Sequence, residues 1–375
     1  GAFSAASNIS GIKSDVFGLV RVLHEHGALA VFDYAASAPY VDINVYEGVD
    51  YLDAIYFSPH KFVGGPGSSG ILIINKDIYE TSYPPTVAGG GTVDYVSSAG
   101  YEFTEDVETR EKAGTPGILQ IIKASLAMEF KEEIGVKKIE EIEHRYLTKM
   151  MDRFRKNKNI QMLGPSDSTN RVCILSFNVH HEGKYLHHRL ASMLLSDLFG
   201  IQSRAGCACA GPYGHVLLGI SNEVSEKFRI AIKEGMGSLK PGWIRINLHY
   251  LMTEEDVDFI LDAIEFIANY GYLYLQEYSI DINTGDWCHN TYSRENKAVS
   301  QFGIKAAFEL ENSDVFNWAE IDSTKEYKKY LKEAKSHSKK LLKTYTGEFK
   351  KYTGNEYEEL RWFNYIHECN SKDPK

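Results

Sequence analysis

Residues 56–70, YFSPHKFVGGPGSSG, place a lysine, Lys61, between an apolar run and a glycine-rich turn. Apolar runs that are rich in β-branched and aromatic residues and bounded by Gly, Pro or Asp are typical of buried strands. Three such strands are predicted around this stretch: residues 28–34 (ALAVFDY), 53–58 (DAIYFS) and 70–75 (GILIIN). Residues 15–27 have apolar residues at helical spacing, so the order of elements indicates an α/β layer with a largely parallel sheet.

The rest of the chain continues with helices and strands and then changes character. The pattern predicts two helices within 117–156, a strand at 171–179, a helix at 185–200, a short strand after it, a strand at 243–250 and a helix at 254–271. After Tyr272 a polar, loop-like region is expected to about residue 315. Residues 323–351 hold ten lysines against three glutamates and predict a docked helix with one apolar face. That face would contain Tyr327, Leu331, Ala334, Leu341, Leu342 and Tyr345.

This pattern predicts four parts. They are a large-domain part (1–125), connecting helices (126–156), a small α/β domain (157–272) and an extension with the lysine-rich helix (273–375).

Composition limits the class of protein. The chain has 375 residues, of which 43% are hydrophobic and 25% charged, and its 41 basic and 51 acidic side chains give a net charge of -10. A net negative chain is not expected to bind nucleic acid through its overall charge, and no apolar run approaches the roughly 20 residues needed to cross a membrane. Its five scattered cysteines suit a reducing compartment, so a cytoplasmic protein is expected.

Lys61 has a carboxylate partner in the predicted sheet. Asp33 ends the strand at 28–34, and the two neighbouring strand ends would present a carboxylate and an amine at one sheet edge, where open α/β sheets bind ligands. Pyridoxal 5'-phosphate (PLP) requires this pair, an amine for a Schiff base and a carboxylate that keeps the pyridine nitrogen protonated. Taken alone, a lysine at a strand end is more often a solvated surface residue.

Over roughly residues 1–270 the chain resembles the class V aminotransferase family of fold-type I PLP enzymes. It is most similar to the cysteine desulfurase and selenocysteine lyase branch. SAASNISG resembles the segment whose asparagine, here Asn8, lies near the cofactor's ring hydroxyl and the substrate carboxylate. VFDYAASAP resembles the strand whose aspartate, here Asp33, pairs with the pyridine nitrogen. SPHK resembles the Schiff-base motif, with Lys61 as the imine lysine, Ser58 donating to the phosphate and His60 beside it.

Three later motifs extend the resemblance. REKAGTPG resembles the loop whose threonine, here Thr115, reaches the phosphate bound by the neighbouring subunit, which implies a homodimer with shared sites. SRAGCACAGPYG resembles the desulfurase loop with the nucleophilic cysteine, here Cys209. WIRINLHYLMTEEDVD resembles the strand and helix whose arginine, here Arg245, binds the substrate α-carboxylate. A planar guanidinium suits bidentate capture of a carboxylate.

Simpler interpretations remain for several of these residues. Asp33 could cap a turn, and His60 could be a packing residue. Cys207 and Cys209 could form half of a metal site, but no second Cys/His pair stands at a recognisable spacing, so no metal is expected. Either thiol could also be buried and inert.

The chain also departs from the family pattern. A glutamine usually stands three residues after the aspartate, and here that position is Ala36. Fold-type I enzymes begin their large domain well before the asparagine motif, so the chain resembles the C-terminal part of such an enzyme, a large domain lacking its front, a small α/β domain and a helical tail. Missing strands would leave sheet edges and apolar faces exposed, and we expect such a chain alone to fold poorly and to bind the cofactor weakly.

The resemblance implies a cysteine desulfurase-like activity on an amino acid as the small-molecule substrate, with Lys61 and Cys209 as the catalytic residues and a sulfur-acceptor protein as a possible partner. Two alternatives stay open. One is transamination or another reaction at Cα without a role for either cysteine. The other is an inactive interaction module that keeps the fold.

Overall fold

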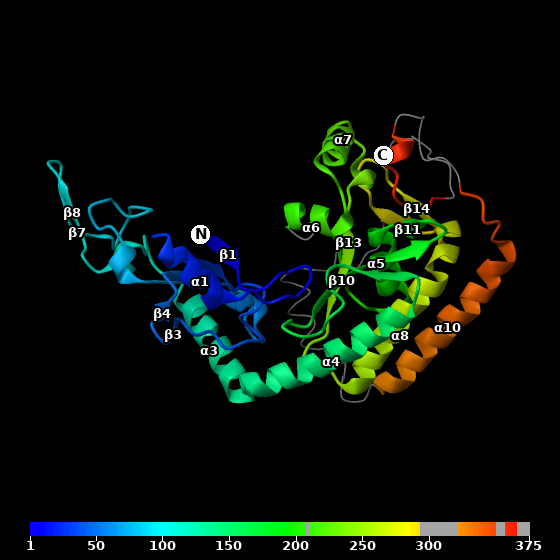
Figure 1. The fold of residues 1–375 in the computed structure, drawn as a ribbon, viewed down its shortest axis with the longest axis horizontal. Helices are drawn as coiled ribbons and strands as arrows, with labels where there is room; N and C mark the ends of the chain where they lie inside the picture. The colour runs from blue at the N-terminus through cyan, green and yellow to red at the C-terminus, as the bar shows by residue number, and fades with distance from the viewer. Residues whose placement is uncertain (208–209, 293–321, 350–356, 366–375) are drawn as a thin grey trace, which may run out of the picture. The chain divides into compact units, whose positions relative to one another are not determined.

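The computed structural model describes residues 1–207, 210–292, 322–349 and 357–365. The chain divides into two compact units, Gly1–Leu147 with Ser168–Ile174, and Thr148–Asp167 with Leu175–Lys375. Figure 1 labels their helices and strands. Among the described residues, no helix is both long enough and apolar enough to cross a membrane.

The first unit is built on a four-stranded sheet. Its strands lie in the order β1-β2-β5-β6, and β1, β2 and β5 are parallel whereas β6 runs antiparallel to β5. The strands are β1 (Ala2–Ser4), β2 (Val31–Asp33), β5 (Ala54–Phe57) and β6 (Ile71–Ile74). Helix α1 (Val16–Glu25) precedes β2. The three predicted strands, the predicted helix and the largely parallel sheet are therefore confirmed.

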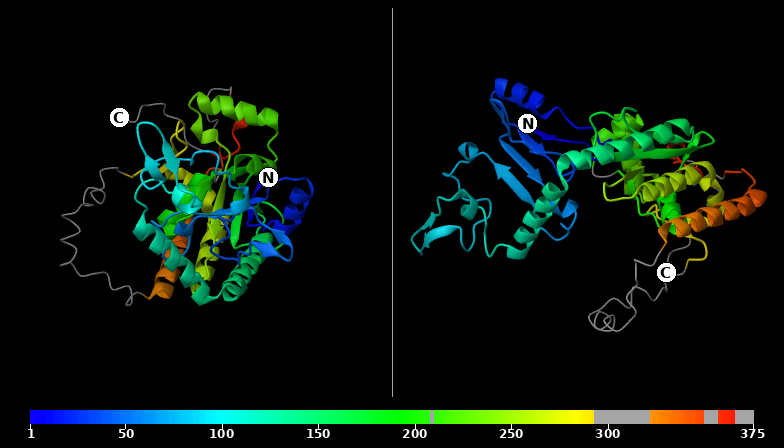
Figure 2. Two further views of the ribbon diagram at one scale, coloured as in Figure 1. Left: turned by 90° about the vertical axis from the view of Figure 1, so that its left-hand side faces the viewer. Right: turned by 90° about the horizontal axis from the view of Figure 1, so that it is seen from below.

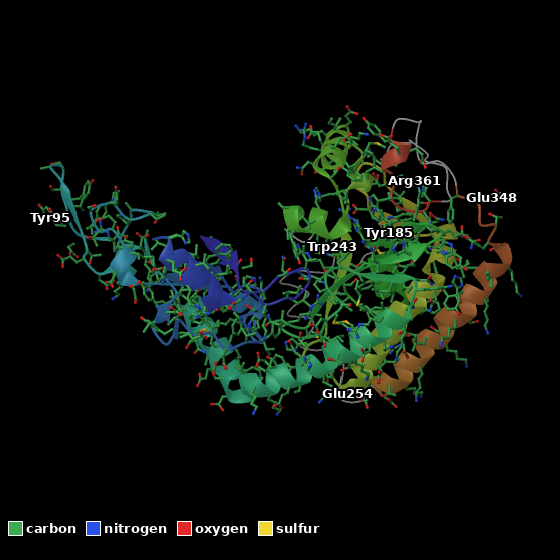
Figure 3. All side chains as sticks on the ribbon, viewed as in Figure 1. Tyr95, Tyr185, Trp243, Glu254, Glu348 and Arg361 are labelled. Atoms are coloured by element: carbon green, nitrogen blue, oxygen red, sulfur yellow. The ribbon has the colours of Figure 1, made fainter. Side chains whose placement is uncertain are left out.

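Further elements complete the first unit, and the last of them, α4, continues into the second unit from Thr148 on. Two small hairpins pair β3 with β4 and β7 with β8, and Figure 3 labels Tyr95 on the second of them. Their bounds are β3 (Tyr46–Glu47), β4 (Asp50–Tyr51), β7 (Val93–Val96) and β8 (Tyr101–Phe103). The helices are α2 (Val107–Arg110), α3 (Ile118–Ile134) and α4 (Val136–Lys156), with 3-10 turns η1 (Pro59–Lys61) and η2 (Lys76–Ile78).

One face of the first unit's sheet forms a core, and part of the remaining apolar surface stays exposed. Phe32 and Ile55 are register partners on adjacent strands, both are buried, and they belong to one cluster with Val20 of α1. By contrast, Leu72 on β6 is 64% exposed. Helix α3 also has exposed apolar side chains: Ile118, Leu119, Ile121, Ile122, Leu126 and Phe130.

The second unit holds a five-stranded sheet. Four strands lie in the order β11-β10-β13-β12, and β9 also pairs with β10. The strands are β9 (Ile160–Met162), β10 (Ile174–His181), β11 (Lys184–Leu186), β12 (Arg204–Gly206) and β13 (Trp243–Asn247). Figure 3 labels Trp243, which is buried, and Tyr185, which is partly buried, in this unit. The helical elements are α5 (His188–Phe199), α6 (Gly211–Leu218), α7 (Asn222–Lys233), η3 (Gly237–Leu239), α8 (Glu254–Tyr270) and η4 (Gly271–Gln276).

The sequence pattern predicts the long elements of this unit and a short strand that corresponds to β12, and it misses the other shorter elements. The strands at 171–179 and 243–250 and the helices at 185–200 and 254–271 correspond to β10, β13, α5 and α8. Helices α6 and α7 were not predicted. The expected loop after Tyr272 is wrong in part, because Tyr278 and Trp287 are buried in a hairpin of β14 (Tyr278–Ile280) and β15 (Trp287–His289).

The lysine-rich segment forms α10 (Ser323–Thr344), which packs against α5, α8 and η4. Figure 2 shows this helix, in orange, alongside the small domain. The predicted docked helix is thus confirmed, but its apolar face does not include Leu342, which is 57% exposed, whereas Leu341 is only 7% exposed. The buried positions Ala334, Ser338 and Leu341 follow each other at intervals of three and four, which keeps them on one side.

Residues 357–365, here called the terminal segment, add to the edge of the second unit's sheet. The segment begins with η6 (Glu358–Leu360) and forms a parallel bridge between Phe363 and Tyr185 of β11. The Tyr185 N–H donates to the Trp362 carbonyl at 3.1 Å, and the Asn364 N–H donates to the Tyr185 carbonyl at 3.0 Å. The terminal segment therefore covers a strand edge that would otherwise lack backbone partners.

Candidate functional site

The carboxyl ends of three parallel strands meet at one edge of the first unit's sheet. Ser4 of β1 pairs with Asp33 of β2, and Asp33 pairs with Tyr56 of β5. The Ala5 N–H donates to the Asp33 carbonyl at 2.8 Å, and the Tyr34 N–H donates to the Tyr56 carbonyl at 2.9 Å. The segments that contain Asn8, Asp33 and Lys61 consequently leave the sheet side by side.

Asp33 is partly buried at the end of β2. Its Oδ1 accepts a hydrogen bond from the Ala35 N–H at 2.7 Å, so the carboxylate caps the turn that follows the strand. The turn-capping interpretation is therefore correct for this oxygen. The bond also fixes the carboxylate at the sheet edge. The register puts the Asp33 side chain on the same face as Tyr56, which is 39% exposed.

Lys61 is the last residue of η1, the 3-10 turn that follows β5. Its N–H donates to the Ser58 carbonyl at 3.0 Å, and the next residue, Phe62, is buried beside Phe57 with 6.1 Å between the ring centroids. Phe62 anchors the turn in the core, whereas His60 and Lys61 are exposed. The lysine is thus held on a rigid turn with its side chain outside the core.

The backbone geometry of the turn after Lys61 explains why glycines stand there. A Cβ on Gly65 would lie 1.8 Å from the Pro59 carbonyl oxygen, so only glycine allows this close approach of the two backbone segments. Gly64 has a φ of +75°, a conformation that favours glycine as well. The pair turns the chain tightly behind the lysine and brings it back to β6.

Asn8 and Thr115 lie on different kinds of loop. Asn8 is in the turn after β1, where the Ser7 hydroxyl oxygen accepts hydrogen bonds from the N–H groups of Ile9 and Ser10 at 3.2 and 3.1 Å. Thr115 is exposed in the loop between α2 and α3. Asn8 therefore belongs to the same edge as Asp33 and Lys61, whereas Thr115 stands on a separate loop.

Arg245 belongs to the second unit and faces another arginine. It lies on β13, and its register partner across the antiparallel pair is Arg204 of β12. Both arginines line a cavity of about 620 Å³. The two arginines place positive charge at the lining of this cavity, which suits an anionic group such as a carboxylate.

The C-terminal extension contributes to the same cavity, which the sequence pattern did not reveal. Tyr327 of α10 lines it, stacks on Phe259 at 4.0 Å between ring centroids and donates its hydroxyl to Asp256 Oδ1 at 2.6 Å. Burial by itself would raise the pKa of Asp256, but the hydrogen bonds from Tyr327 and Thr253 outweigh it and hold this pKa below its ordinary value. The apolar spacing of the lysine-rich helix predicted that Tyr327 packs inward, although not into which cavity.

The cysteine loop lies between β12 and α6. Cys209 falls outside the described residues. Its neighbour Cys207 is partly buried, and the Cys207 carbonyl accepts a hydrogen bond from the Ala210 N–H at 3.2 Å, directly before α6. Across the described ranges, no three His, Cys, Asp or Glu side chains gather as a metal site would require.

The donor set at the first unit's sheet edge suits PLP chemically. An amine, a carboxylate, an amide and a hydroxyl, on Lys61, Asp33, Asn8 and Ser58, leave three adjacent strands at their carboxyl ends. Such an edge is where open α/β sheets bind ligands, and these groups match an aldehyde, a ring nitrogen, a ring hydroxyl and a phosphate. The residues present therefore fit the cofactor that the sequence suggests.

Comparisons with known proteins agree with this fold and extend it. The family model described as Aminotransferase class-V matches residues 2–260. A probable cysteine desulfurase of Pyrococcus abyssi is 31% identical over 265 residues, covering 70% of this chain and 58% of the relative. Another, from Halalkalibacterium halodurans, is 32% identical over 214 residues, covering 56% of this chain and 49% of the relative.

A solved structure agrees as well. The apo cysteine desulfurase from Thermococcus onnurineus NA1 has a TM-score of 0.59 at 28% identity, and the match covers 72% of this chain and 59% of that protein. The predicted fold type is thereby confirmed. The chain spans between 49% and 59% of the lengths of these three proteins.

Proposed function

This chain belongs to the aminotransferase class-V family, and we propose that it carries the cofactor-anchoring and sulfur-accepting residues of a PLP-dependent cysteine desulfurase. The observation that supports the proposal most directly is the pairing of β2 with β5. This pairing brings the segments that carry Asp33 and Lys61 to one sheet edge. The names of the relatives support desulfuration over the other reactions of the family.

The proposal gives each residue at the sheet edge a role toward the cofactor. Lys61 would hold PLP covalently through its amine, and Asp33 would keep the ring nitrogen protonated. Asn8 would bind the ring hydroxyl, which matters more here because Ala36 offers no side-chain hydrogen bond. Ser58, with His60 beside it, would bind the phosphate. When bound, PLP supplies an electron sink for the bonds at the substrate Cα.

The reaction itself would use Arg245, Lys61 and Cys209. Arg245 would bind the α-carboxylate of cysteine, and Lys61 would remove the Cα proton as a general base. The Cys209 thiolate would attack the substrate sulfur, so that an S–S bond forms on Cys209 while the substrate Cβ–S bond breaks. The electron pair of the broken bond stays with the substrate, which takes up a proton at Cβ, regains a proton at Cα from Lys61 and leaves as alanine. The sulfur on Cys209 then passes to an acceptor, which would be a protein.

The proposed assembly is a homodimer in which Thr115 reaches the phosphate in the partner's site. Two features of the first unit support it. Thr115 is exposed, and α3, which begins three residues later, has a row of exposed apolar side chains that includes Leu119 and Ile122. Sedimentation equilibrium should give twice the chain mass. The double substitution Leu119→Glu with Ile122→Glu should shift the equilibrium toward the monomer.

The test of the proposed function measures three quantities on the chain supplied with PLP. The wild type should show cofactor absorbance and should produce equal amounts of alanine and transferable sulfur from cysteine. Lys61→Ala should lose the absorbance and lower kcat by at least about 100-fold. Cys209→Ser should keep the absorbance and lose sulfur transfer, whereas the matched variant Cys207→Ser should keep both.

Two other outcomes would replace the proposal. Formation of a keto acid at an unchanged rate in Cys209→Ser would indicate transamination by the same lysine and aspartate. The absence of cofactor absorbance in the wild type would favour a non-catalytic interaction module.

A further inference from the structure

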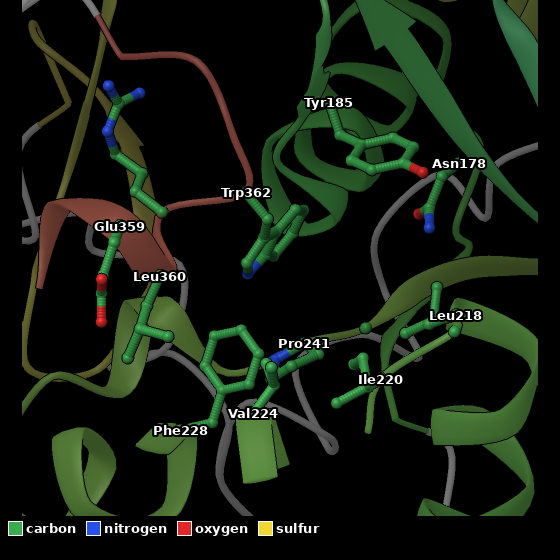
Figure 4. A pocket seen from close by; sticks show the side chains of 13 residues that line it. Asn178, Tyr185, Leu218, Ile220, Val224, Phe228, Pro241, Glu359, Leu360 and Trp362 are labelled. Atoms are coloured by element: carbon green, nitrogen blue, oxygen red, sulfur yellow. The ribbon is translucent and has the colours of Figure 1, made fainter. Parts of the chain in front are cut away.

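Two features of the second unit lie outside the proposed reaction. One is a pocket of about 240 Å³ beside the terminal segment, with mostly apolar walls and Asn178 among its lining residues (Figure 4). Its charged lining residues are bonded within the unit, since Arg361 donates to Glu358 and Glu359 pairs with Lys227 at 3.4 Å. The other feature is the outer face of α10, whose charge indicates the chemistry of a partner.

Eight lysines form one continuous row on α10, here called the lysine stripe. They are Lys325, Lys328, Lys329, Lys332, Lys335, Lys339, Lys340 and Lys343, and all eight are exposed. At 3.6 residues per turn, their positions fall within an arc of about 140° around the helix. Apart from the lysines this arc contains only Ser336, so no acidic residue of α10 interrupts the stripe.

The lysine stripe lies opposite the face through which α10 docks. Ala334 is 3% exposed, and its carbonyl accepts a hydrogen bond from the Tyr274 hydroxyl at 3.2 Å. Lys325 and Lys343 each stand nine residues from Ala334, which is two and a half helical turns. Figure 1 shows α10 along the outside of the second unit. The stripe therefore faces solvent over about 27 Å, at 1.5 Å of rise per residue.

The positive charge of the stripe is mostly uncompensated. Among the residues that the structure describes, it has one ion pair, between Lys329 and Glu326 at 3.2 Å. Lysines stand four residues apart at four places in α10, as Lys328 and Lys332 do, and like charges at this spacing repel each other. Solvated helix faces usually mix both signs of charge. A negatively charged partner would relieve this repulsion.

The side chains of the stripe favour a diffuse negative surface over a specific polar ligand. The stripe has no arginine, which would bind a single phosphate or carboxylate through two parallel bonds, and no asparagine or glutamine, which would bond to base edges. Lysine acts as a point charge on a flexible stem. Clusters of four to eight basic residues on an amphipathic helix are typical of binding to anionic lipid headgroups.

Leu342 adds an apolar group at the border of the stripe. Its side chain is 57% exposed, and it lies about one turn after Lys339. Apolar side chains of amphipathic helices are buried at the boundary between the headgroups and the acyl chains of a bilayer. A nucleic-acid backbone or an acidic peptide offers no such apolar layer. The combination of lysines with an exposed leucine therefore favours a lipid surface.

We propose that α10 binds the surface of an anionic lipid bilayer through the lysine stripe, with Leu342 in the headgroup region. The helix would lie parallel to the membrane plane, because the long lysine stems then allow the ammonium groups to reach the headgroups together. The net charge of the whole chain, -10, does not predict such binding, since the lysines are concentrated on one face. The proposal does not depend on the PLP chemistry.

The experiment measures co-sedimentation of the full chain with phosphatidylcholine vesicles, either pure or with about one third phosphatidylserine. At about 0.1 M salt the wild type should bind the vesicles that contain phosphatidylserine and should not bind the pure ones. Raising the salt to about 0.5 M should release the protein, because salt screens exposed charges.

A stripe variant with four lysines replaced tests the surface directly. Its substitutions are Lys328→Gln, Lys332→Gln, Lys335→Gln and Lys339→Gln. The variant should bind at least about 100-fold more weakly, since each lysine near the surface strengthens binding roughly fivefold. Glutamine favours helix as lysine does, so the variant should fold normally, as checked by circular dichroism. Arginine at the same four positions should retain the binding.

A matched control changes the net charge equally at exposed lysines in and after α4. Its substitutions are Lys137→Gln, Lys138→Gln, Lys156→Gln and Lys158→Gln. The control variant should bind the vesicles within about twofold of the wild type, because these lysines lie outside the stripe. Leu342→Ala should weaken the binding roughly threefold.

Four results would overturn the proposal. The first is no binding of the wild type to the anionic vesicles. The second is equal binding to pure phosphatidylcholine. The third is an equal loss in the stripe variant and the control variant, which would show that net charge alone governs the binding. The fourth is binding to a mixed-sequence DNA duplex or to polyglutamate without binding to the vesicles, which would assign the stripe to another class of partner.

Discussion

The two units differ in how far their sheet edges and apolar faces are covered by other residues of the same unit. In the second unit the terminal segment pairs with β11, and its Phe363 is fully buried. In the first unit the edge strand β6 and helix α3 keep large apolar side chains such as Leu72 and Leu119 in contact with solvent. The second unit therefore completes its core with residues that come after the family's part of the chain.

This contrast indicates which residues contribute most to the free energy of folding. Residues whose apolar area is removed from water contribute to stability, and residues that remain exposed contribute little. The chain offers a convenient probe, because the tryptophans among the described residues, at positions 243, 287 and 362, belong to the second unit. Their fluorescence follows the unfolding of the second unit, and the following predictions use it.

The largest expected effect is at Phe363. Its ring meets the His187 ring at 4.7 Å and the Trp362 ring at 5.2 Å between centroids, so Phe363→Ala leaves a cavity in the second unit. We expect a loss of about 3–5 kcal/mol in the free energy of unfolding, measured by urea titration with tryptophan fluorescence. The control Leu72→Ala, at an exposed position of β6, should change stability by less than about 0.5 kcal/mol by circular dichroism. Equal losses would remove the contrast between the units.

The next effect separates two adjacent leucines of α10. Leu341 is buried against the small domain and Leu342 is exposed. Leu341→Ala should destabilise the second unit by about 3 kcal/mol, whereas Leu342→Ala should stay within about 0.5 kcal/mol. Thermal unfolding followed by tryptophan fluorescence measures both. A larger loss in Leu342→Ala than in Leu341→Ala would mean that α10 docks through a different face.

Acid should weaken the second unit through a buried histidine pair. Burial lowers the pKa of His188 to about 3 and also lowers the pKa of His187, whose ring is packed against Trp362 and Phe363. The unfolded chain takes up protons on both rings below about pH 6.5, whereas the folded chain does not. The unfolded state is therefore favoured as the pH falls from about 6.5 toward the lowered pKa values.

Between pH 7 and pH 5 each ring should cost about 2 kcal/mol of stability. Urea titrations at the two pH values measure the loss, and His187→Gln should show about half the wild-type loss. If the variant and the wild type lose the same amount, His187 does not contribute to the acid sensitivity.

The smallest effect is expected on α3. Leu119 is 78% exposed, so Leu119→Gln should change the free energy of unfolding by less than about 0.5 kcal/mol in the monomer, measured by circular dichroism at low protein concentration. A loss above about 1 kcal/mol under these conditions would show that α3 is covered within a single chain.

Long periodic segments were readable from the sequence, and short ones were not. The strands with buried β-branched runs, such as β5, and the amphipathic helices, such as α8, agree with the patterns within a few residues. The hairpin β14–β15 was missed because its strands have three residues each, too few to establish a period. Leu342 was misplaced because adjacent residues on a helix point in directions about 100° apart, and a run of two leucines does not show which is buried.

The candidate site likewise has features that the sequence predicts and features that only the fold determines. The motifs around Asn8, Asp33 and Lys61 identify the residues and their order along the chain. The pairing of β1 with β2 and β5, which brings these segments to one edge, is a property of the folded sheet. The opposition of Arg204 and Arg245 depends likewise on the register of β12 and β13, which no spacing along the chain reveals.

The sequence by itself determined the α/β class and the longer elements, and it supplied the candidates for PLP binding and sulfur transfer, because these follow from side-chain chemistry, from motif resemblance and from the period of each local segment. Only the tertiary structure decided that the terminal segment completes the second unit's sheet and encloses a pocket beside Asn178. That outcome depends on contacts between residues nearly two hundred positions apart, and hydrogen bonding and burial at such a distance are set by the whole fold rather than by local pattern.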